Sequence, residues 1–369
     1  MSSLFLLLAV GLLGPILAFS KKVGLPVAVG EILVGVAFGI SGFDLINIHE
    51  PATQLISQVG FALVMMLVGS HIQVRQTLGS KNFFVAVRNI AISVVMALVL
   101  ALAIVRLTGI DHLAIYVLIM ASSSAAVVLP LVASNQTASV NLLVTQVAVA
   151  DLLGIIALPT VMEPANTPTI LIGALSVTAC AALVYFFLRI AERNGNWLKL
   201  REFSRERRFG LELRISLLVL LGLASLAQSF GVSVMIAGFS LGLAIAANGV
   251  PHRLAKQLFA VTEGLFAPVF YVLLGASIDF RTVFVDSRLI LLSILLLGFG
   301  LVSHLSGMAF GQKFGEAGLS AASLGIPTAV VSIGLTSHAI SSGEGAAFTL
   351  AMLLSVIMAT FFARKIKAS

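Results

Sequence analysis

The sequence predicts an all-α, polytopic membrane protein with about 13 transmembrane helices. Three observations lead to this fold class: the composition, the length of the apolar runs and the one-sided placement of the basic residues. Of the 369 residues, 59% are hydrophobic and only 10% are charged, whereas soluble domains carry about 25% charged residues. The single cysteine, Cys180, excludes an internal disulfide.

The apolar segments are long enough to cross a bilayer, which takes about 20 residues of helix. The first of them, 3–19, lacks the basic start and the small-residue cleavage site of a signal peptide, so we count it as a span. The predicted spans are 3–19, 25–43, 53–70, 83–105, 112–132, 139–161, 168–190, 211–230, 232–248, 258–277, 288–310, 317–338 and 345–363.

The basic residues separate by side when these spans are threaded alternately through a membrane. Of the 22 Lys and Arg residues, 18 fall on one side, three fall on the other (Arg106, Arg281 and Arg288), and Arg88 lies within a span. The positive-inside rule places the basic side in the cytoplasm. We therefore expect the N-terminus outside and the C-terminus in the cytoplasm, and we read the net charge of +7 as topology rather than nucleic-acid binding.

One sizeable loop, 191–210, divides the chain and carries much of this basic charge. We expect it to act as a topology determinant on anionic headgroups, with a regulatory contact as the alternative. The chain stops a few residues after its last span. We therefore expect a single transmembrane domain over 1–369, without a C-terminal regulatory domain.

The two sides of this loop resemble each other, which predicts an internal duplication. The first repeat covers 25–190 and the second covers 211–363, which leaves 3–19 as an extra N-terminal helix. Three pairs of segments align in the same order: "GLPVAVGEILVG" (24–35) with "GVSVMIAGFSLG" (231–242), "MLVGSHIQV" (66–74) with "VLLGASIDF" (272–280), and "AAVVLPLV" (125–132) with "TAVVSIGL" (328–335).

The expected topology makes the two repeats inverted, because the aligned spans 25–43 and 232–248 run in opposite directions across the membrane. Inverted repeats are typical of secondary transporters, in which the substrate site lies near the midplane where the repeats meet. The best sequence indicator of such a site is a pair of interrupted spans at corresponding positions.

Such a pair is present. "ASSSAAVVLP" (121–130) brings three serines and Pro130 into the fifth span, and "ASLGIPTAVVSIG" (322–334) brings Gly325 and Pro327 into the twelfth. Proline removes a backbone donor and disrupts the helical ladder, so we expect two broken helices. The alternative is a pair of kinked helices with small-residue packing faces.

Asp151 lies within the apolar run "QVAVADLLGIIALP" (146–159), near the middle of the span that follows the first interruption. An aspartate at that depth costs about 2.5–3.5 kcal/mol on insertion scales. Burial disfavours the charged form of a carboxyl group, so Asp151 can hold either a proton or a cation. That competition is the minimum chemistry of proton–cation exchange. The alternative is a neutral aspartate that is hydrogen-bonded to neighbouring backbone.

Other polar residues are candidates for the same site. The alternative is a dimer-interface or core-support role for Glu31, an interfacial or partnered position for Glu263, and helix packing for the rest. The serines sit at the first interruption, Thr328 and Ser332 come from the second repeat, and Gln146 shares the span of Asp151 but not its face, because five residues turn a helix by about 140°. The ion-binding candidates are Asp151, Ser122, Ser123, Ser124, Gln146, Thr328 and Ser332, and the accessory candidates are Glu31, Glu263 and His304.

Taken together, four features of the sequence resemble the transmembrane domain of the monovalent cation:proton antiporter-2 family. The residues that carry the resemblance are "GLPVAVGEILVGVAFGISG" (24–42), "FALVMMLVGSHIQ" (61–73), Asp151 and "GLFAPVFYVLLGASID" (264–279). The resemblance implies a homodimer, with a dimerisation domain and a core domain that contains two crossing helices. It also implies an elevator-like movement of the core that carries Asp151 between the two faces of the membrane.

The sequence departs from relatives in this family at three places. Ala150 precedes Asp151 where relatives have a polar or acidic residue, Met308 stands where some have a lysine, and "IPTAVVSIG" (326–334) lacks the charged residues that many carry after the proline. These departures leave Asp151 without an evident ionisable partner. They favour electroneutral, one-for-one exchange.

The sequence therefore predicts an antiporter of the inner (plasma) membrane that exchanges protons for sodium or potassium at Asp151, with a role in pH homeostasis. The transported monovalent cation would bind at Asp151; sodium and potassium both take oxygen ligands. We expect no enzyme activity, no cofactor and no nucleic-acid partner. The transport should need no ATP, because no phosphate-binding motif is present. The alternatives are a sodium-coupled symporter of an organic solute, a non-transporting membrane sensor, and a channel.

Overall fold

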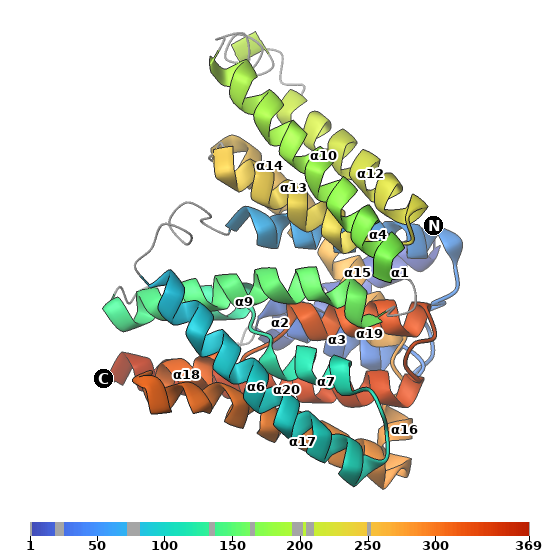
Figure 1. The fold of residues 1–369 in the computed structure, drawn as a ribbon. Coiled ribbons are helices and arrows are strands. Elements are labelled where there is room, and N and C mark those ends of the chain that lie inside the picture. Colours follow the sequence, from blue (N-terminus) through green and yellow to red (C-terminus); the bar gives the residue numbers. More distant parts are fainter. Residues whose placement is uncertain are drawn as a thin grey trace. The chain divides into compact units, whose positions relative to one another are not determined.

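The computed structural model describes residues 2–18, 26–71, 82–132, 137–162, 167–193, 202–203, 210–248 and 252–368, and every regular element in them is a helix. Within these ranges, nine helical segments are long and apolar enough to cross a membrane, and four shorter apolar helices accompany them. The protein is a multi-pass membrane protein (Figure 1). Most of the basic loop 191–210 lies outside the described residues.

The long spans follow the predicted ones closely, except that the span predicted at 258–277 extends over Arg253–Val285. They are α4 (Pro51–His71), α6 (Phe83–Thr108), α7 (Leu113–Ala121) with α8 (Ala125–Val132), α9 (Ala138–Met162), α12 (Leu211–Ser229), α14 (His252–Val261) with the π-helix η2 (Thr262–Phe266), α15 (Ala267–Ala276) and α16 (Phe280–Val285), α17 (Ser287–Leu305) with the 3-10 helix η3 (Ser306–Phe310), α18 (Phe314–Ser320) with α19 (Gly325–Thr336), and α20 (Ser342–Ala368).

The remaining apolar helices are α1 (Ser2–Gly11), α2 (Leu13–Ala18), α3 (Val27–Phe38), α10 (Thr167–Arg193) and α13 (Val234–Asn248). The chain divides into two compact units. Unit 1 comprises 1–48, 77–164 and 271–369, and unit 2 comprises 49–76 and 165–270. The division falls within α15, between Phe270 and Tyr271.

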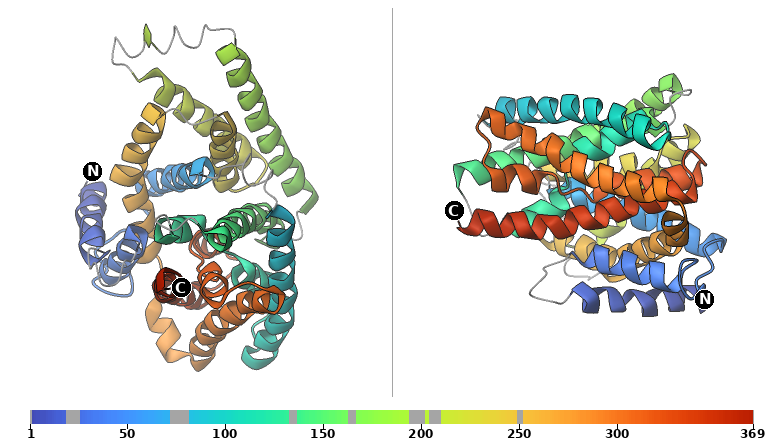
Figure 2. Two further views of the ribbon diagram at one scale, coloured as in Figure 1. Left: turned by 90° about the vertical axis from the view of Figure 1, so that its left-hand side faces the viewer. Right: turned by 90° about the horizontal axis from the view of Figure 1, so that it is seen from below.

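Unit 1 contains both interrupted spans and α9. In it, α17 packs against α6 and α20, and the three helices run side by side in the right-hand view of Figure 2. The α6 helix buries Ala97 and Ala101 while it exposes Val95 and Val99. A helix that is apolar on every face is typical of a membrane span, and its small buried residues allow close approach of neighbouring helices.

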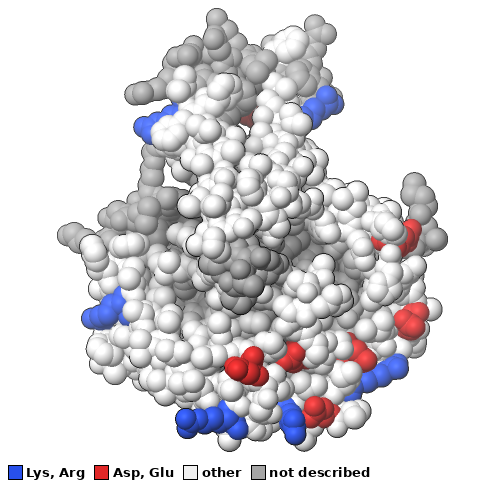
Figure 3. All heavy atoms as spheres, turned by 45° about the vertical axis from the view of Figure 1, so that its right-hand side comes forward, with Lys and Arg blue, Asp and Glu red and all other residues white. Residues whose placement is uncertain are grey.

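Unit 2 is built around the packing of α4 against α13, with α10 and α12 packed against α13 and lying side by side (Figure 1). The rings of Phe61 and Phe270 stack in this unit with centroids 4.7 Å apart. The face of the molecule drawn in Figure 3 is largely uncharged, and its charged side chains lie near the margins. This distribution agrees with the prediction that most of the surface faces lipid.

Glycines bring one pair of helices together in unit 1. A Cβ on Gly35 of α3 would overlap the carbonyl of Val272 in α15, and a Cβ on Gly275 would overlap the carbonyl of Ile32. The two main chains therefore touch, with no room for a side chain between them.

The same arrangement recurs at the aligned positions in unit 2. A Cβ on Gly242 of α13 would overlap the carbonyl of Met66 in α4, and a Cβ on Gly69 would overlap the carbonyl of Phe239. In the sequence alignment, Gly35 corresponds to Gly242, and the other three residues correspond in the same way. Each pair therefore joins one helix from the first half of the chain to one helix from the second half.

Two spans of unit 1 are interrupted by a short non-helical segment. The α7 helix ends at Ala121 and α8 begins at Ala125, while α18 ends at Ser320 and α19 begins at Gly325. Pro130 lies inside α8 rather than at the interruption. Pro327 lies in the first turn of α19, where a missing N–H costs nothing because the first helical N–H groups have no intrahelical partner.

Candidate functional site

Asp151 lies in the interior of unit 1, with 2% of its surface exposed. Its carboxylate oxygen Oδ2 accepts a hydrogen bond from the main-chain N–H of Ala125, at 3.0 Å. Ala125 is the first residue of α8, and the N–H groups of a helix start favour a negative charge. The other oxygen, Oδ1, makes no hydrogen bond to the described residues, so one oxygen of the carboxylate is available to a ligand.

The start of α19 lies beside this free oxygen. A Cβ added to Gly325 would lie 3.8 Å from Asp151 Oδ1. One turn beyond Asp151, Gly154 packs so closely on Ile326 that a Cβ there would come within 3.0 Å of the isoleucine side chain. The missing side chain at Gly154 thus lets α19 approach α9, and it brings Gly325 to the carboxylate.

Hydrogen bonds tie the two interruptions to each other. The N–H of Ser124 donates to the carbonyl of Ala322 at 2.9 Å, and the Ser123 hydroxyl donates to the carbonyl of Ser320 at 2.5 Å. The hydroxyls of Ser122 and Ser323 lie 2.6 Å apart. Main-chain groups at one interruption are therefore hydrogen-bonded to groups at the other, as buried backbone requires.

The α17 helix supports both interruptions through two consecutive residues. Ser303 donates to the carbonyl of Met120 at 3.0 Å, and His304 Nδ1 lies 3.0 Å from Ser320 Oγ. His304 Nε2 is buried and makes no hydrogen bond of good geometry, although the main chain of Met120 and Ser122 lies beside the ring. The structure thus places His304 at the ends of α7 and α18 and shows no hydrogen bond between it and Asp151.

Gln146 is held by a cluster of amides that the sequence did not single out. Its Oε1 accepts hydrogen bonds from Asn89 and Gln312, both at 3.2 Å, and all three side chains are buried. Arg88 donates to Asn89 Oδ1 at 3.3 Å and to the carbonyl of Phe310 at 3.1 Å. The sequence does not indicate this cluster, because Asn89 and Gln312 lie 57 and 166 positions from Gln146 along the chain.

The other predicted residues occupy varied positions. Thr328 is buried in the second turn of α19, and its hydroxyl lies 3.2 Å from Met352 Sδ. Ser332 is half-buried further along α19. Glu31 is buried in α3 beside Gly14 of α2, and Glu263 is exposed in η2, which belongs to unit 2. None of these four is hydrogen-bonded to Asp151.

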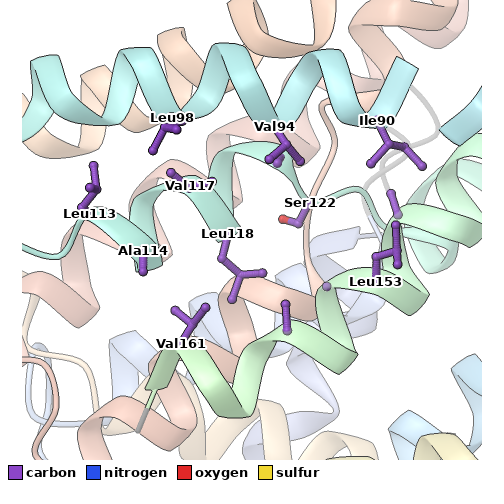
Figure 4. Close-up of a pocket in the computed structure, with 14 residues that line it drawn as sticks. Ile90, Val94, Leu98, Leu113, Ala114, Val117, Leu118, Ser122, Leu153 and Val161 are labelled. Atoms are coloured by element: carbon purple, nitrogen blue, oxygen red, sulfur yellow. The ribbon is translucent and has the colours of Figure 1, made fainter. Parts of the chain in front are cut away.

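A groove of about 410 Å³ runs between α6, α7 and α9 (Figure 4). Its lining is apolar apart from Ser122, and side chains such as Val94, Leu98 and Leu118 are directed into it. Ala150, the neighbour of Asp151, also lines it. An unpaired ion is costly in such surroundings, so we do not assign an ion path to this groove.

The chemistry of the site is that of one carboxylate among neutral groups. Among the described residues, no three His, Cys, Asp or Glu side chains cluster as the ligands of a metal ion would. Within the described part of the chain, Asp151 is the acidic side chain that contacts place beside Ala125 and Gly325, where α8 and α19 begin. This arrangement suits a ligand with a single positive charge, whether a proton or a monovalent cation.

Comparison with known proteins gives relatives along the whole chain. YjbQ of Bacillus subtilis (strain 168) is 25% identical over 99% of this chain, which spans 63% of the length of YjbQ. The Na+/H+ antiporter of Enterococcus hirae is 24% identical over 80% of this chain and 77% of its own length. The Na+/H+-K+ antiporter GerN of Bacillus cereus is 23% identical over 71% of this chain and 67% of its own length.

The fold also matches a solved structure. The sodium proton antiporter MjNhaP1 from Methanocaldococcus jannaschii, determined at pH 8, superposes with a TM-score of 0.67 over 99% of this chain and 98% of its own, at 18% identity. Residues 7–365 match the family model described as sodium/hydrogen exchanger, transmembrane. The chain therefore belongs to the transmembrane sodium/hydrogen exchanger family.

Proposed function

We propose that the protein is a secondary transporter that exchanges protons for monovalent cations at Asp151. The observation that carries this proposal is a buried carboxylate whose Oδ2 is bound by the start of α8 and whose Oδ1 faces the start of α19 without a hydrogen bond. The names of the Enterococcus and Bacillus cereus relatives agree with it, since both are Na+/H+ antiporters and one also names K+.

The exchange follows from competition for one group. A carboxylate in a dry interior is costly when it is charged and unpaired. Asp151 therefore lowers its free energy by binding either a proton or a cation, and the two exclude each other. Cation binding from one side releases a proton there, and the reverse occurs on the other side, so no ATP is required.

Alternating access would come from an elevator-like movement of the part that carries the site. The division of the chain supports this, because both interrupted spans and α9 lie within unit 1 and can travel as one piece. Inverted repeats are supported by the equivalent glycine contacts of α3 with α15 and of α13 with α4. We further propose two crossing broken helices, a homodimer with its own dimerisation domain, an N-terminus outside and a C-terminus in the cytoplasm of a plasma membrane.

The test is proton flux in sealed proteoliposomes after separate additions of sodium, potassium, lithium and choline salts. The wild type should release protons with at least one alkali cation and not with choline. Asp151→Asn keeps an oxygen that can accept the Ala125 N–H but cannot exchange a proton, so its flux should vanish.

Asp44→Asn is the matched control, because Asp44 is exposed and its positive φ of 51° is tolerated by asparagine. Its flux should equal that of the wild type. Cation-driven proton release by Asp151→Asn at the wild-type rate would refute the proposed site, and a wild type that responds to no cation would refute the function.

A further inference from the structure

The space beside Asp151 Oδ1 is shaped by a residue that has no side chain. A Cβ on Gly325 would come within 4 Å of Oδ1 and of no other heavy atom of the described residues outside its own helix backbone and chain neighbours. Among the other glycines of unit 1, Gly35 and Gly275 are explained by main chains that touch. At Gly325, a methyl group would meet only the carboxylate, so the missing side chain at this position bears directly on the site.

The backbone does not require glycine at this position either. Gly325 is not among the residues with positive φ, and it opens a regular helix of 12 residues. Neither strain nor packing therefore calls for a missing side chain at residue 325.

We infer that Gly325 determines the size of the cation that Asp151 accepts, and that the missing side chain at this position lets K+ bind as well as Na+. This inference rests on the proposed function. A cation bound to Oδ1 needs room for itself and for its remaining oxygen ligands on the side that Ala125 does not occupy. That side is the one that a methyl group at residue 325 would fill.

The position of Gly325 is also fixed, as a selective site requires. Ile326, the next residue, packs on Gly154 of α9, one turn from Asp151. The hydrogen bond between Ser124 and Ala322 holds the two interruptions together just before α8 and α19 begin. The distance from Gly325 to the carboxylate is thus set by contacts on both sides of it.

The test compares wild type, Gly325→Ala and Gly298→Ala in two assays. Gly298 is the matched control, because it lies in α17 of unit 1 and a Cβ there would meet no described heavy atom within 4 Å. The first assay is proton release from proteoliposomes, titrated with Li+, Na+ and K+. The second is the thermal stability of the detergent-solubilised full chain in the same salts, since a ligand that binds only the folded state stabilises it.

Wild type and Gly298→Ala should respond to K+ as well as to Na+. In Gly325→Ala, the half-saturating concentration of K+ should rise by about tenfold relative to that of Li+, which is the scale of one added methyl group in a fitted pocket. The stabilisation by K+ should fall in parallel while the stabilisation by Li+ remains.

Several outcomes would overturn the inference. If the ratio of the half-saturating K+ and Li+ concentrations in Gly325→Ala equalled that of the wild type, and the wild type exchanged both cations, the role of Gly325 would be refuted. The proposed function would still stand. A wild type that is stabilised by Li+ but not by K+ would refute it even if Gly325→Ala did not fold. A wild type that responds to no cation would refute the proposed function and the inference together.

Discussion

Asp151 Oδ2 and the N–H of Ala125 lie 3.0 Å apart, and they join the helix that carries the buried carboxylate to the start of α8. From the sequence, the alternative to an ion site was a neutral aspartate that is hydrogen-bonded to neighbouring backbone. The structure contains one such bond, and it uses only one of the two carboxylate oxygens. The remaining oxygen is the one on which the proposed exchange depends.

Exchange should be electroneutral, with one proton moved per cation. Among the described residues, Asp151 is the carboxylate that lies beside the starts of α8 and α19, Ala150 precedes it, and Met308 is exposed. One group that binds either ligand sets a ratio of one. Transport rates in proteoliposomes should therefore not change when the membrane potential is clamped at different values.

A current under opposing ion gradients would contradict this stoichiometry and would require a second proton carrier. His304 is the nearest candidate, because it is buried and its Nε2 makes no hydrogen bond of good geometry. If such a current were seen, its loss in His304→Ala would identify the histidine as that carrier.

Gln146→Ala should lower stability without changing which cation is preferred. The substitution leaves the donors of Asn89 and Gln312 buried without their acceptor, which costs about 1–3 kcal/mol. The midpoint of thermal unfolding should fall, while the ratio of half-saturating Na+ and Li+ concentrations stays at the wild-type value. Gln228→Ala is the control, because its bond to Gln58 is exposed; a changed cation ratio in Gln146→Ala would show that Gln146 reaches the ion.

Gly35→Ala and Gly242→Ala should destabilise the protein by similar amounts. Each added methyl group would overlap a main-chain carbonyl of the facing helix, and overpacking of this kind costs about 1–3 kcal/mol. Gly222→Ala in α12 is the control, because its Cβ would meet no described heavy atom within 4 Å. Unfolding midpoints of the purified variants would check this, and a neutral result at only one of the two sites would contradict their equivalence.

An ion pair between a histidine and a glutamate outside the site should make the stability of the protein depend on pH. His112 Nε2 lies 3.0 Å from Glu344 Oε1, and the hydrogen bond to Glu344, aided by the charge of Asp111, raises the pKa of His112 above its usual 6.5. The groups that face the ring are Glu344, Asp111 and Tyr116.

A raised folded-state pKa means that the stabilisation by protonated His112 is complete below pH about 6.5 and is lost as the pH rises through the folded value. The unfolding midpoint of the wild type should therefore fall over that range more than that of His112→Gln. If the unfolding midpoints of wild type and His112→Gln changed in parallel with pH, the pair of His112 and Glu344 would contribute nothing to stability.

The sequence by itself determined where the chain crosses the membrane and which residue types stand at the interruptions. Predicted spans such as 83–105 and 139–161 agree closely with α6 and α9. These features are local, because span length follows from apolar runs and helix ends follow from the residues at them. The same local reasoning was wrong about Pro130, which the sequence associated with the first interruption and which lies within α8.

Only the tertiary structure decided which groups face each other. The bond between Asp151 and Ala125 joins residues 26 positions apart, and Gln146 binds Gln312 across 166. In a membrane, lipid tails are as apolar as helix interfaces, so hydrophobicity does not reveal which face of a span packs and which meets lipid. Gly325 could be read from the sequence as part of an interruption, but its place beside Asp151 Oδ1 follows from the close packing of Ile326 on Gly154.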